Sequence, residues 1–167
     1  MQLAANQAQD VVNRIKKIMS IQIDHARPEE KESVVTLLKK ADLLTEDLPD
    51  SLRDFLLAKK DGLLIGVAGL QMFRPVGLLR SVAVKPAHQG KGIAGQMVEQ
   101  LLAGADEEDL QAVYLITTTA DHYFDRYGFM AVSREQVPEA IQQTKQFSGL
   151  CPSTAVVMKR NLKHRTE

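Results

Sequence analysis

The sequence has one cysteine, no tryptophan and no apolar run long enough to cross a bilayer. A lone cysteine, Cys151, excludes an internal disulfide framework and fits a reducing compartment. The N-terminus lacks the apolar core of a signal peptide, so we expect a cytoplasmic protein without a membrane partner. Metal-ligand spacing is also missing among the histidines, and no metal site is expected from His25, His88, His122 and His164.

Charge of one sign is not in excess either. Lysine plus arginine number 21, as do aspartate plus glutamate, so the formal net charge is zero and nothing suggests nucleic acid as a partner. The composition, with 44% hydrophobic and 25% charged residues, is that of an ordinary soluble protein. A length of 167 residues predicts one domain with a sizeable core.

The first 20 residues form a separate unit in this prediction. Their apolar stripe predicts an amphipathic helix that lies on the body or on a second subunit, which would make the protein a homodimer; the stripe consists of Val11, Val12, Ile15, Ile18 and Met19. Met19-Ser20 also has the appearance of a natural start, so residues 1–20 are either a native helical extension or sequence upstream of that start. Residues 21–160 are the expected domain, and residues 161–167 its tail.

Apolar periodicity predicts an α/β order along that domain. The expected strands are 21–26, 55–58, 63–73, 78–84, 113–118, 129–132 and 155–159. Helices are expected after Pro28, from Ile93 onward, and over 123–127 and 138–147. The acidic run 106–109 is expected to be a solvated loop.

The chain is organised around residues 78–102. An apolar strand stops before Pro86, and a glycine-rich turn then opens a helix. The first amides of a helix have no partner within it and favour an anion. Gly90 and Gly92 remove side chains that would block a phosphate, and Lys91 adds a cation at the rim. The turn therefore predicts a phosphate-bearing ligand.

Three interpretations of this turn are open. Gly90, Gly92 and Gly95 spell the dinucleotide fingerprint G-x-G-x-x-G. Against it, residues 85–89 separate the strand from the glycines, much of a domain precedes them, and the next strand ends in threonines rather than an acid. An ordinary connection with flexible glycines is the second interpretation.

The third rests on Gln89 to Ala94, which read Gln-x-x-Gly-x-Ala after a Val-Ala-Val-x-Pro strand end. This resembles motif A of the GCN5-related N-acetyltransferases (GNAT superfamily), and residues 123–129 resemble the Phe-Tyr-x-x-x-Gly-Phe segment of that family. The resemblance implies a single GNAT domain whose mixed central sheet, flanked by helices, splits between 78–84 and 113–118. It also implies acetyl-CoA as cosubstrate, with its pantetheine arm along Val82, Ala83 and Val84 and its pyrophosphate on the turn of Gln89, Gly90, Lys91, Gly92, Ile93, Ala94 and Gly95.

The resemblance does not assign the catalytic residues of this sequence as directly. Many GNAT enzymes protonate the leaving thiolate with a tyrosine at the position of Phe124, and some carry a glutamate base at the position of Leu78. Either Tyr123 or Tyr127 replaces that tyrosine, or water and the proton of the amine suffice. The acetyl oxygen could take a backbone amide near Val82.

Candidate acceptor contacts follow from strand alternation, which puts Leu78, Arg80, Val82 and Val84 on one face. Arg80 suits a carboxylate through paired hydrogen bonds, although it could instead pair with a structural acid or face solvent. Thr117 and Thr118 end the neighbouring strand and are candidates for orienting acceptor or pantetheine, unless strand propensity alone explains them.

A closer resemblance concerns the acceptor. Residues 79–84, 115–120, Gly128-Phe129 and 147–155 look like the arsenic-resistance-operon GNAT subfamily, which is itself similar to the acetyltransferase domain of N-acetylglutamate synthase. Both imply acetylation of a small amine, the α-amino group of an amino acid or of an arsenical analogue. The alternative is a domain that binds acetyl-CoA as a sensor or interaction module without transferring the acetyl group.

Overall fold

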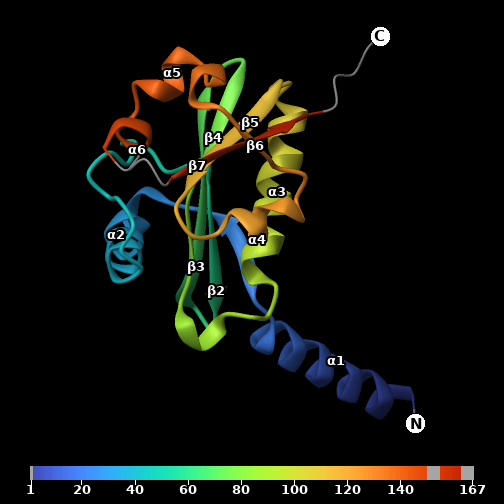
Figure 1. Ribbon diagram of the computed structural model, residues 1–167. Coiled ribbons are helices and arrows are strands. Elements are labelled where there is room, and N and C mark those ends of the chain that lie inside the picture. Colours follow the sequence, from blue (N-terminus) through green and yellow to red (C-terminus); the bar gives the residue numbers. More distant parts are fainter. Residues whose placement is uncertain (1, 150–154, 163–167) are drawn as a thin grey trace.

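A seven-stranded mixed sheet is the centre of the computed structural model, which describes residues 2–149 and 155–162 (Figure 1). The strand order is β1-β2-β3-β4-β5-β7-β6. The strands are β1 Gln22–His25, β2 Phe55–Lys60, β3 Leu63–Phe73, β4 Val76–Val84, β5 Ala112–Thr117, β6 Met130–Val132 and β7 Val156–Asn161. Only β4 and β5 run parallel, and β7 lies between β5 and β6. The expected α/β class with a mixed sheet is confirmed.

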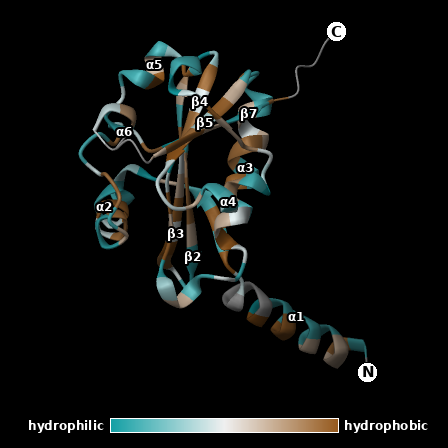
Figure 2. Cartoon of the chain, in the orientation of Figure 1, coloured by the Kyte–Doolittle hydropathy of each residue, from teal (hydrophilic) through white to brown (hydrophobic). Residues whose placement is uncertain are grey.

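Helices cover both faces of this sheet. One face carries α3 (Ile93–Glu107) and α4 (Asp121–Asp125); the other carries α2 (Lys31–Lys40), α5 (Glu139–Gln142) and α6 (Lys145–Ser148) (Figure 1). The short 3₁₀ turns are η1 Pro28–Glu30, η2 Pro86–His88 and η3 Arg134–Gln136. Apolar colour concentrates on the strands and on the inner sides of α2 and α3 (Figure 2).

Separate apolar clusters fill the two faces. On the α3 face, buried helix residues such as Met97, Val98 and Leu101 pack on Leu79 of β4 and Leu115 of β5. On the other face, one cluster joins α2 to β2 and β3, and a second joins α5 and α6 to β4, β5 and β7. The central strands are thus buried on both sides, which explains their nearly continuous apolar sequences.

The two parallel strands separate after a short contact. Pairing between β4 and β5 covers only Val76–Leu78 against Ala112–Tyr114. Beyond that point the β3–β4 register shifts between Val67 and Gly69, and Ser81 has φ +58°. A residue held in this left-handed region marks a bulge that bends the strand. The predicted split between these two strands is confirmed.

The same bulge inverts the side-chain alternation of β4. Before it, Leu79 packs toward α3 and Leu78 toward α5; after it, Val82 and Val84 pack toward α3. The prediction that Leu78, Arg80, Val82 and Val84 share one face is therefore wrong. An extra residue in one strand changes the phase of everything that follows it.

Two helical predictions also differ from the structure. Residues 138–147 form α5 and α6 rather than one helix, because Thr144 interrupts them and its hydroxyl accepts a hydrogen bond from the Phe147 amide at 3.2 Å. The acidic run 106–109 is not all loop, since α3 continues to Glu107. The carboxylate of Glu108 binds Arg74 at 2.7 Å.

The N-terminal residues form a helix, α1 (Gln2–Met19), that extends away from the domain (Figure 1). Leu3, Val11, Val12 and Ile15 are all exposed on it, so these positions do not lie on the body. Contact of α1 with a second subunit stays a prediction. Of the helices within the described residues, none is long and apolar enough to cross a membrane. Cys151 and residues 163–167 of the expected tail lie outside the described residues.

A glycine in β3 provides a test of core packing. A Cβ at Gly69 would lie 2.5 Å from the ring of Phe55, which is 1% exposed. Overpacking of this kind costs about 1–3 kcal/mol, so we expect Gly69→Ala to lower the melting temperature by about 3–10 °C. Gly104→Ala is the matched control: its Cβ meets nothing within 4 Å, and alanine in a helix gains about 0.5–1 kcal/mol over glycine. Equal melting temperatures of the two variants would contradict this packing.

Candidate functional site

A cleft of about 740 Å³ occupies the gap between the separated strands. One wall is β4 from Leu79 to Val84, and the other is the end of β5 with the loop after it, residues 115–120. Because the two strands stop pairing at Leu78, the backbone of β4 beyond this point has no strand beside it on the β5 side among the residues that the structure describes. An unpaired strand edge can accept an extended ligand as an added strand.

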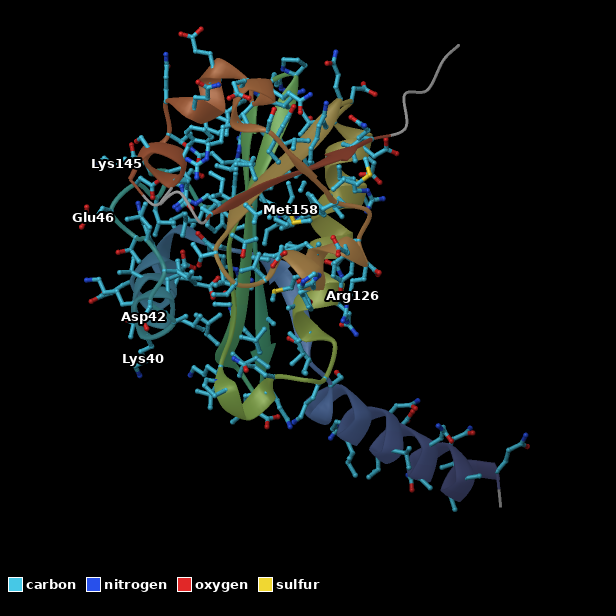
Figure 3. All side chains as sticks on the ribbon, viewed as in Figure 1. Lys40, Asp42, Glu46, Arg126, Lys145 and Met158 are labelled. Carbon is cyan, nitrogen blue, oxygen red and sulfur yellow. The ribbon has the colours of Figure 1, made fainter. Side chains whose placement is uncertain are left out.

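The cleft opens on both faces of the sheet. Gln89, Ala94 and Tyr123 line it on the α3–α4 face, and Asp42, Leu43 and Gln146 line it on the α2–α6 face. Asp42 and Arg126 accordingly lie on opposite sides of the sheet (Figure 3). Two ligands could enter from opposite faces and meet between the strands.

The glycine turn borders the α3 mouth and leaves the start of α3 without a side-chain cap. The side-chain amide of Gln89 donates to the Val84 carbonyl at 2.9 Å, which fastens the turn to the end of β4. Gly90 and Gly92 both have φ +79°, and Gly92 is the N-cap of α3 with no side chain capping it. A Cβ on either glycine would meet nothing within 4 Å, so open space lies in front of the helix amides.

A second hollow of about 370 Å³ continues from this turn, lined by Val84, His88, Gln89, Gly90, Gly92, Ile93, Ala94, Tyr123, Arg126 and Tyr127. Four of these residues also line the cleft, so the two spaces form one groove. Of the predicted turn residues, Lys91 and Gly95 line neither space. Gly95 instead lies beneath Tyr127, since a Cβ there would overlap the tyrosine hydroxyl.

Sequence reasoning missed two polar side chains in this groove. Arg126 lies over the ring of Tyr123 at 4.9 Å and brings a cation to the hollow. Its spacing from Tyr123, three residues along a helix, was the available signal. His88 has a buried Nδ1 without a hydrogen-bond partner among the residues that the structure describes. Both groups suit a ligand that carries phosphate.

The two candidate tyrosines contact each other. Their hydroxyls lie 3.3 Å apart, and Tyr123 lines both the cleft and the hollow whereas Tyr127 lines only the hollow. Burial raises the pKa of Tyr123 to about 12, and the hydrogen bond with Tyr127 adds to the increase. At neutral pH Tyr123 therefore keeps its proton and can donate a hydrogen bond into the cleft. Phe124 is buried and packs edge-on against Phe129.

Arg80 lies at the α2 side of the cleft and is already paired. Its Nη1 and Nη2 donate to the two carboxylate oxygens of Asp47 at 3.0 and 2.6 Å. Nη1 also donates to Gln71 Oε1 at 3.1 Å, and Nε donates to Ser81 Oγ at 3.2 Å. Pairing with an acid of the protein was one of the alternatives to a contact with the acceptor, and the structure shows that pairing. A role for Arg80 in binding the acceptor stays a prediction.

The threonines at the end of β5 differ in what they do. Thr117 Oγ1 accepts from the Ala120 amide at 3.0 Å and from the Thr119 amide at 3.4 Å, so it shapes the turn before α4. Thr118 follows the last residue of β5 and lines the cleft. Among the described residues, no group of three or more histidine, cysteine, aspartate or glutamate side chains could hold a metal ion.

Comparison with known proteins identifies the family of this chain. The profile of the Acetyltransferase (GNAT) family matches residues 15–129. The chain belongs to the GNAT family. An amino-acid acetyltransferase of Aliivibrio fischeri is 28% identical over 127 residues, covering 75% of this chain and 27% of that protein. The GNAT chain thus spans about a quarter of the length of that relative.

Solved structures share the GNAT fold at low identity. N-acetylglutamate synthase from Neisseria gonorrhoeae, crystallised with coenzyme A and N-acetyl-glutamate, has a TM-score of 0.75 at 19% identity and covers 87% of this chain and 36% of its own. Rv2747 from Mycobacterium tuberculosis, crystallised with CoA, has a TM-score of 0.72 at 23% identity, over 85% of this chain and 99% of its own. These likenesses concern the fold.

Proposed function

We propose that this GNAT domain transfers the acetyl group of acetyl-CoA to the α-amino group of an amino acid or a close analogue. The observation that carries the proposal is the cleft between β4 and β5, which opens on both faces of the sheet and has the uncapped start of α3 at one mouth. A phosphate-bearing donor would enter from the α3 face, and the amine from the α2–α6 face.

The donor would be held by three features of the chain. The uncapped start of α3, with Gly90 and Gly92, would bind the pyrophosphate, and Arg126 and His88 would bind polar groups beside it. The open edge of β4 from Val82 to Val84 would pair with the amides of the pantetheine arm. Acetyl-CoA supplies the thioester, whose carbonyl carbon is the electrophile.

Direct attack in a ternary complex is the simplest chemistry for this geometry. The free amine forms a C–N bond to the acetyl carbon, the C–S bond breaks, and the proton lost by the amine passes to water. A backbone amide near Val82 would stabilise the negative charge on the carbonyl oxygen. Tyr123, held protonated by burial, would donate a hydrogen bond to the departing sulfur.

An amino acid as acceptor is supported by the names of the relatives and by the chain itself. Several relatives that match over this domain are named amino-acid acetyltransferases. Arg80 provides a buried guanidinium at the acceptor side of the cleft. An arsenical amino-acid analogue, which the arsenic-operon resemblance suggests, belongs to the same chemical class.

The test is release of free CoA from acetyl-CoA across amino acids, arsenical analogues, polyamines and peptides, with thiol background from Cys151 subtracted. We expect release with one class of α-amino acid. If no compound in the panel releases CoA while acetyl-CoA still raises the melting temperature, a domain that binds acetyl-CoA as a sensor is favoured instead. A shift with NAD but none with acetyl-CoA would overturn the donor site.

A further inference from the structure

The ion pair between Arg80 and Asp47 joins the sheet to a loop at the acceptor mouth. The Arg80 side chain is 1% exposed and that of Asp47 is 13% exposed. Two parallel N–H to oxygen bonds, at 2.6 and 3.0 Å, make this a bidentate contact of the kind that guanidinium forms with any free carboxylate.

Asp47 belongs to residues 41–54, which connect α2 to β2 without helix or strand. Leu48 and Leu52 of this loop pack into the apolar cluster of α2, β2 and β3, and Lys31 Nζ donates to the Pro49 carbonyl at 3.1 Å. Asp42 and Leu43, at the start of the same loop, line the cleft. The loop that carries Asp47 thus also supplies part of the wall of the acceptor mouth.

We propose that Asp47 occupies the place of the acceptor carboxylate, so that an amino-acid acceptor binds by exchanging its own carboxylate for that of Asp47 on Arg80. This inference rests on the proposed function. The exchange replaces one bidentate carboxylate with another, so the buried guanidinium keeps a counter-charge throughout. The displaced Asp47 returns to water, because its side chain already reaches the surface.

The exchange would make Asp47 a specificity-determining residue. A neutral amine offers no charge to replace the aspartate, so the loop would stay closed against it. An amino acid can open the loop, and the apparent affinity for it is lowered by the fraction of molecules in which Asp47 is bound to Arg80. A competitor built into the chain thus gives selectivity for carboxylates at the expense of affinity.

Asp47→Asn tests this competition, measured with the best amino acid of the panel and with its carboxamide. Asparagine keeps the shape but loses the charge, so we expect the KM for the amino acid to fall by about 3–10-fold, with kcat within about twofold and the KM for the carboxamide unchanged. Glu46→Gln is the matched control, because Glu46 is an exposed acid of the same loop whose side chain points outward (Figure 3). It should change neither constant.

A rise instead of a fall in the KM of Asp47→Asn for the amino acid would overturn the proposal. If the ion pair only holds the wall of the site in shape, Asp47→Asn will raise the KM for the amino acid and its carboxamide together. Arg80→Lys tests the other member of the ion pair. Lysine cannot form the bidentate contact, so the KM for the amino acid should rise while the KM for the carboxamide stays constant.

Hydrogen exchange of the wild type provides a measurement that needs no variant. Binding of the N-acetylated amino acid together with CoA should speed amide exchange in residues 41–54 relative to CoA alone, whereas a fixed wall should slow it. Wild-type protein that releases no CoA with any amino acid would refute the proposed function. An active wild type with slowed exchange would refute only the role of Asp47.

Discussion

Tyr123→Phe is expected to lower kcat by about 100-fold with little change in the KM for either substrate. The phenol is the protonated group that lines both the cleft and the hollow beside the glycine turn. A hydrogen-bond donor to charge that develops only in the transition state contributes about 10²–10³-fold to the rate. Steady-state release of CoA measures the effect, and the melting temperature establishes that the variant is folded.

Tyr127→Phe is the matched control for that variant. It removes the same atom from the other member of the pair, but Tyr127 does not line the cleft. Losing one neutral hydrogen bond, worth about 0.5–1.5 kcal/mol, predicts at most about a tenfold effect. A larger loss in Tyr127→Phe than in Tyr123→Phe would assign the donor to Tyr127, and no loss in either would leave the proton to water.

The pH dependence of the reaction follows from the same group. Because the pKa of Tyr123 is raised to about 12, the hydrogen-bond donor is present throughout the neutral and mildly alkaline range. Rates should therefore rise with pH as the acceptor amine loses its proton, without a fall from Tyr123 before pH 11. The free energy of unfolding changes in the opposite direction. The unfolded chain loses the Tyr123 proton near pH 10 while the folded chain keeps it to about pH 12, so stability falls as pH rises from about 10 to 12.

Gly92→Val is expected to raise the KM for acetyl-CoA by about 30-fold or more. The valine side chain would project into the open space before the uncapped amides of α3, where the pyrophosphate is proposed to lie. Loss of one or two charge-assisted hydrogen bonds, each worth about 1.5–3 kcal/mol, accounts for that magnitude. The KM for the acceptor, which enters at the other mouth, should stay within about twofold.

Valine at Gly92 also strains the backbone, and a second glycine separates strain from binding. Gly62 has φ +77° in the turn between β2 and β3 and nothing within 4 Å of its Cβ position. Gly62→Val should lower stability by a similar amount, about 1–2 kcal/mol, without changing the KM for acetyl-CoA. If both variants lose acetyl-CoA affinity equally, the effect comes from general destabilisation and the turn is not the phosphate site.

Local features of the sequence were enough for the glycine turn and the elements around it. The strand that stops at Pro86, the glycines with positive φ and the helix that starts at Ile93 depend on residues close together in the chain. Such local elements are set by backbone sterics and by hydrogen bonding within a few residues, and the periodicity of the sequence indicates them directly. The order of the strands along the chain followed from the same signals, whereas the split of the sheet was implied by the resemblance to the GNAT superfamily.

The acceptor side depended on contacts between distant residues. Arg80 meets Asp47, 33 positions away, and a bulge opposite Ala68 decides which face of β4 each later residue occupies. A bulge leaves no mark in the hydrophobic pattern, so alternation predicted the wrong face for Val82 and Val84. The division of 138–147 into two helices at Thr144 was missed because Ile141 and Phe147, on either side of the break, pack into the same apolar cluster.

The amino-acid sequence by itself therefore determined the fold class, the family and the turn proposed to hold the donor, since each rests on short-range chemistry. Tertiary structure alone decided that the cleft passes through the sheet, that Tyr123 rather than Tyr127 lines it, and that Arg80 already holds a carboxylate. The reason is physical: a charge buried in a domain must be neutralised by whatever acid the fold brings to it, and sequence distance does not limit that choice.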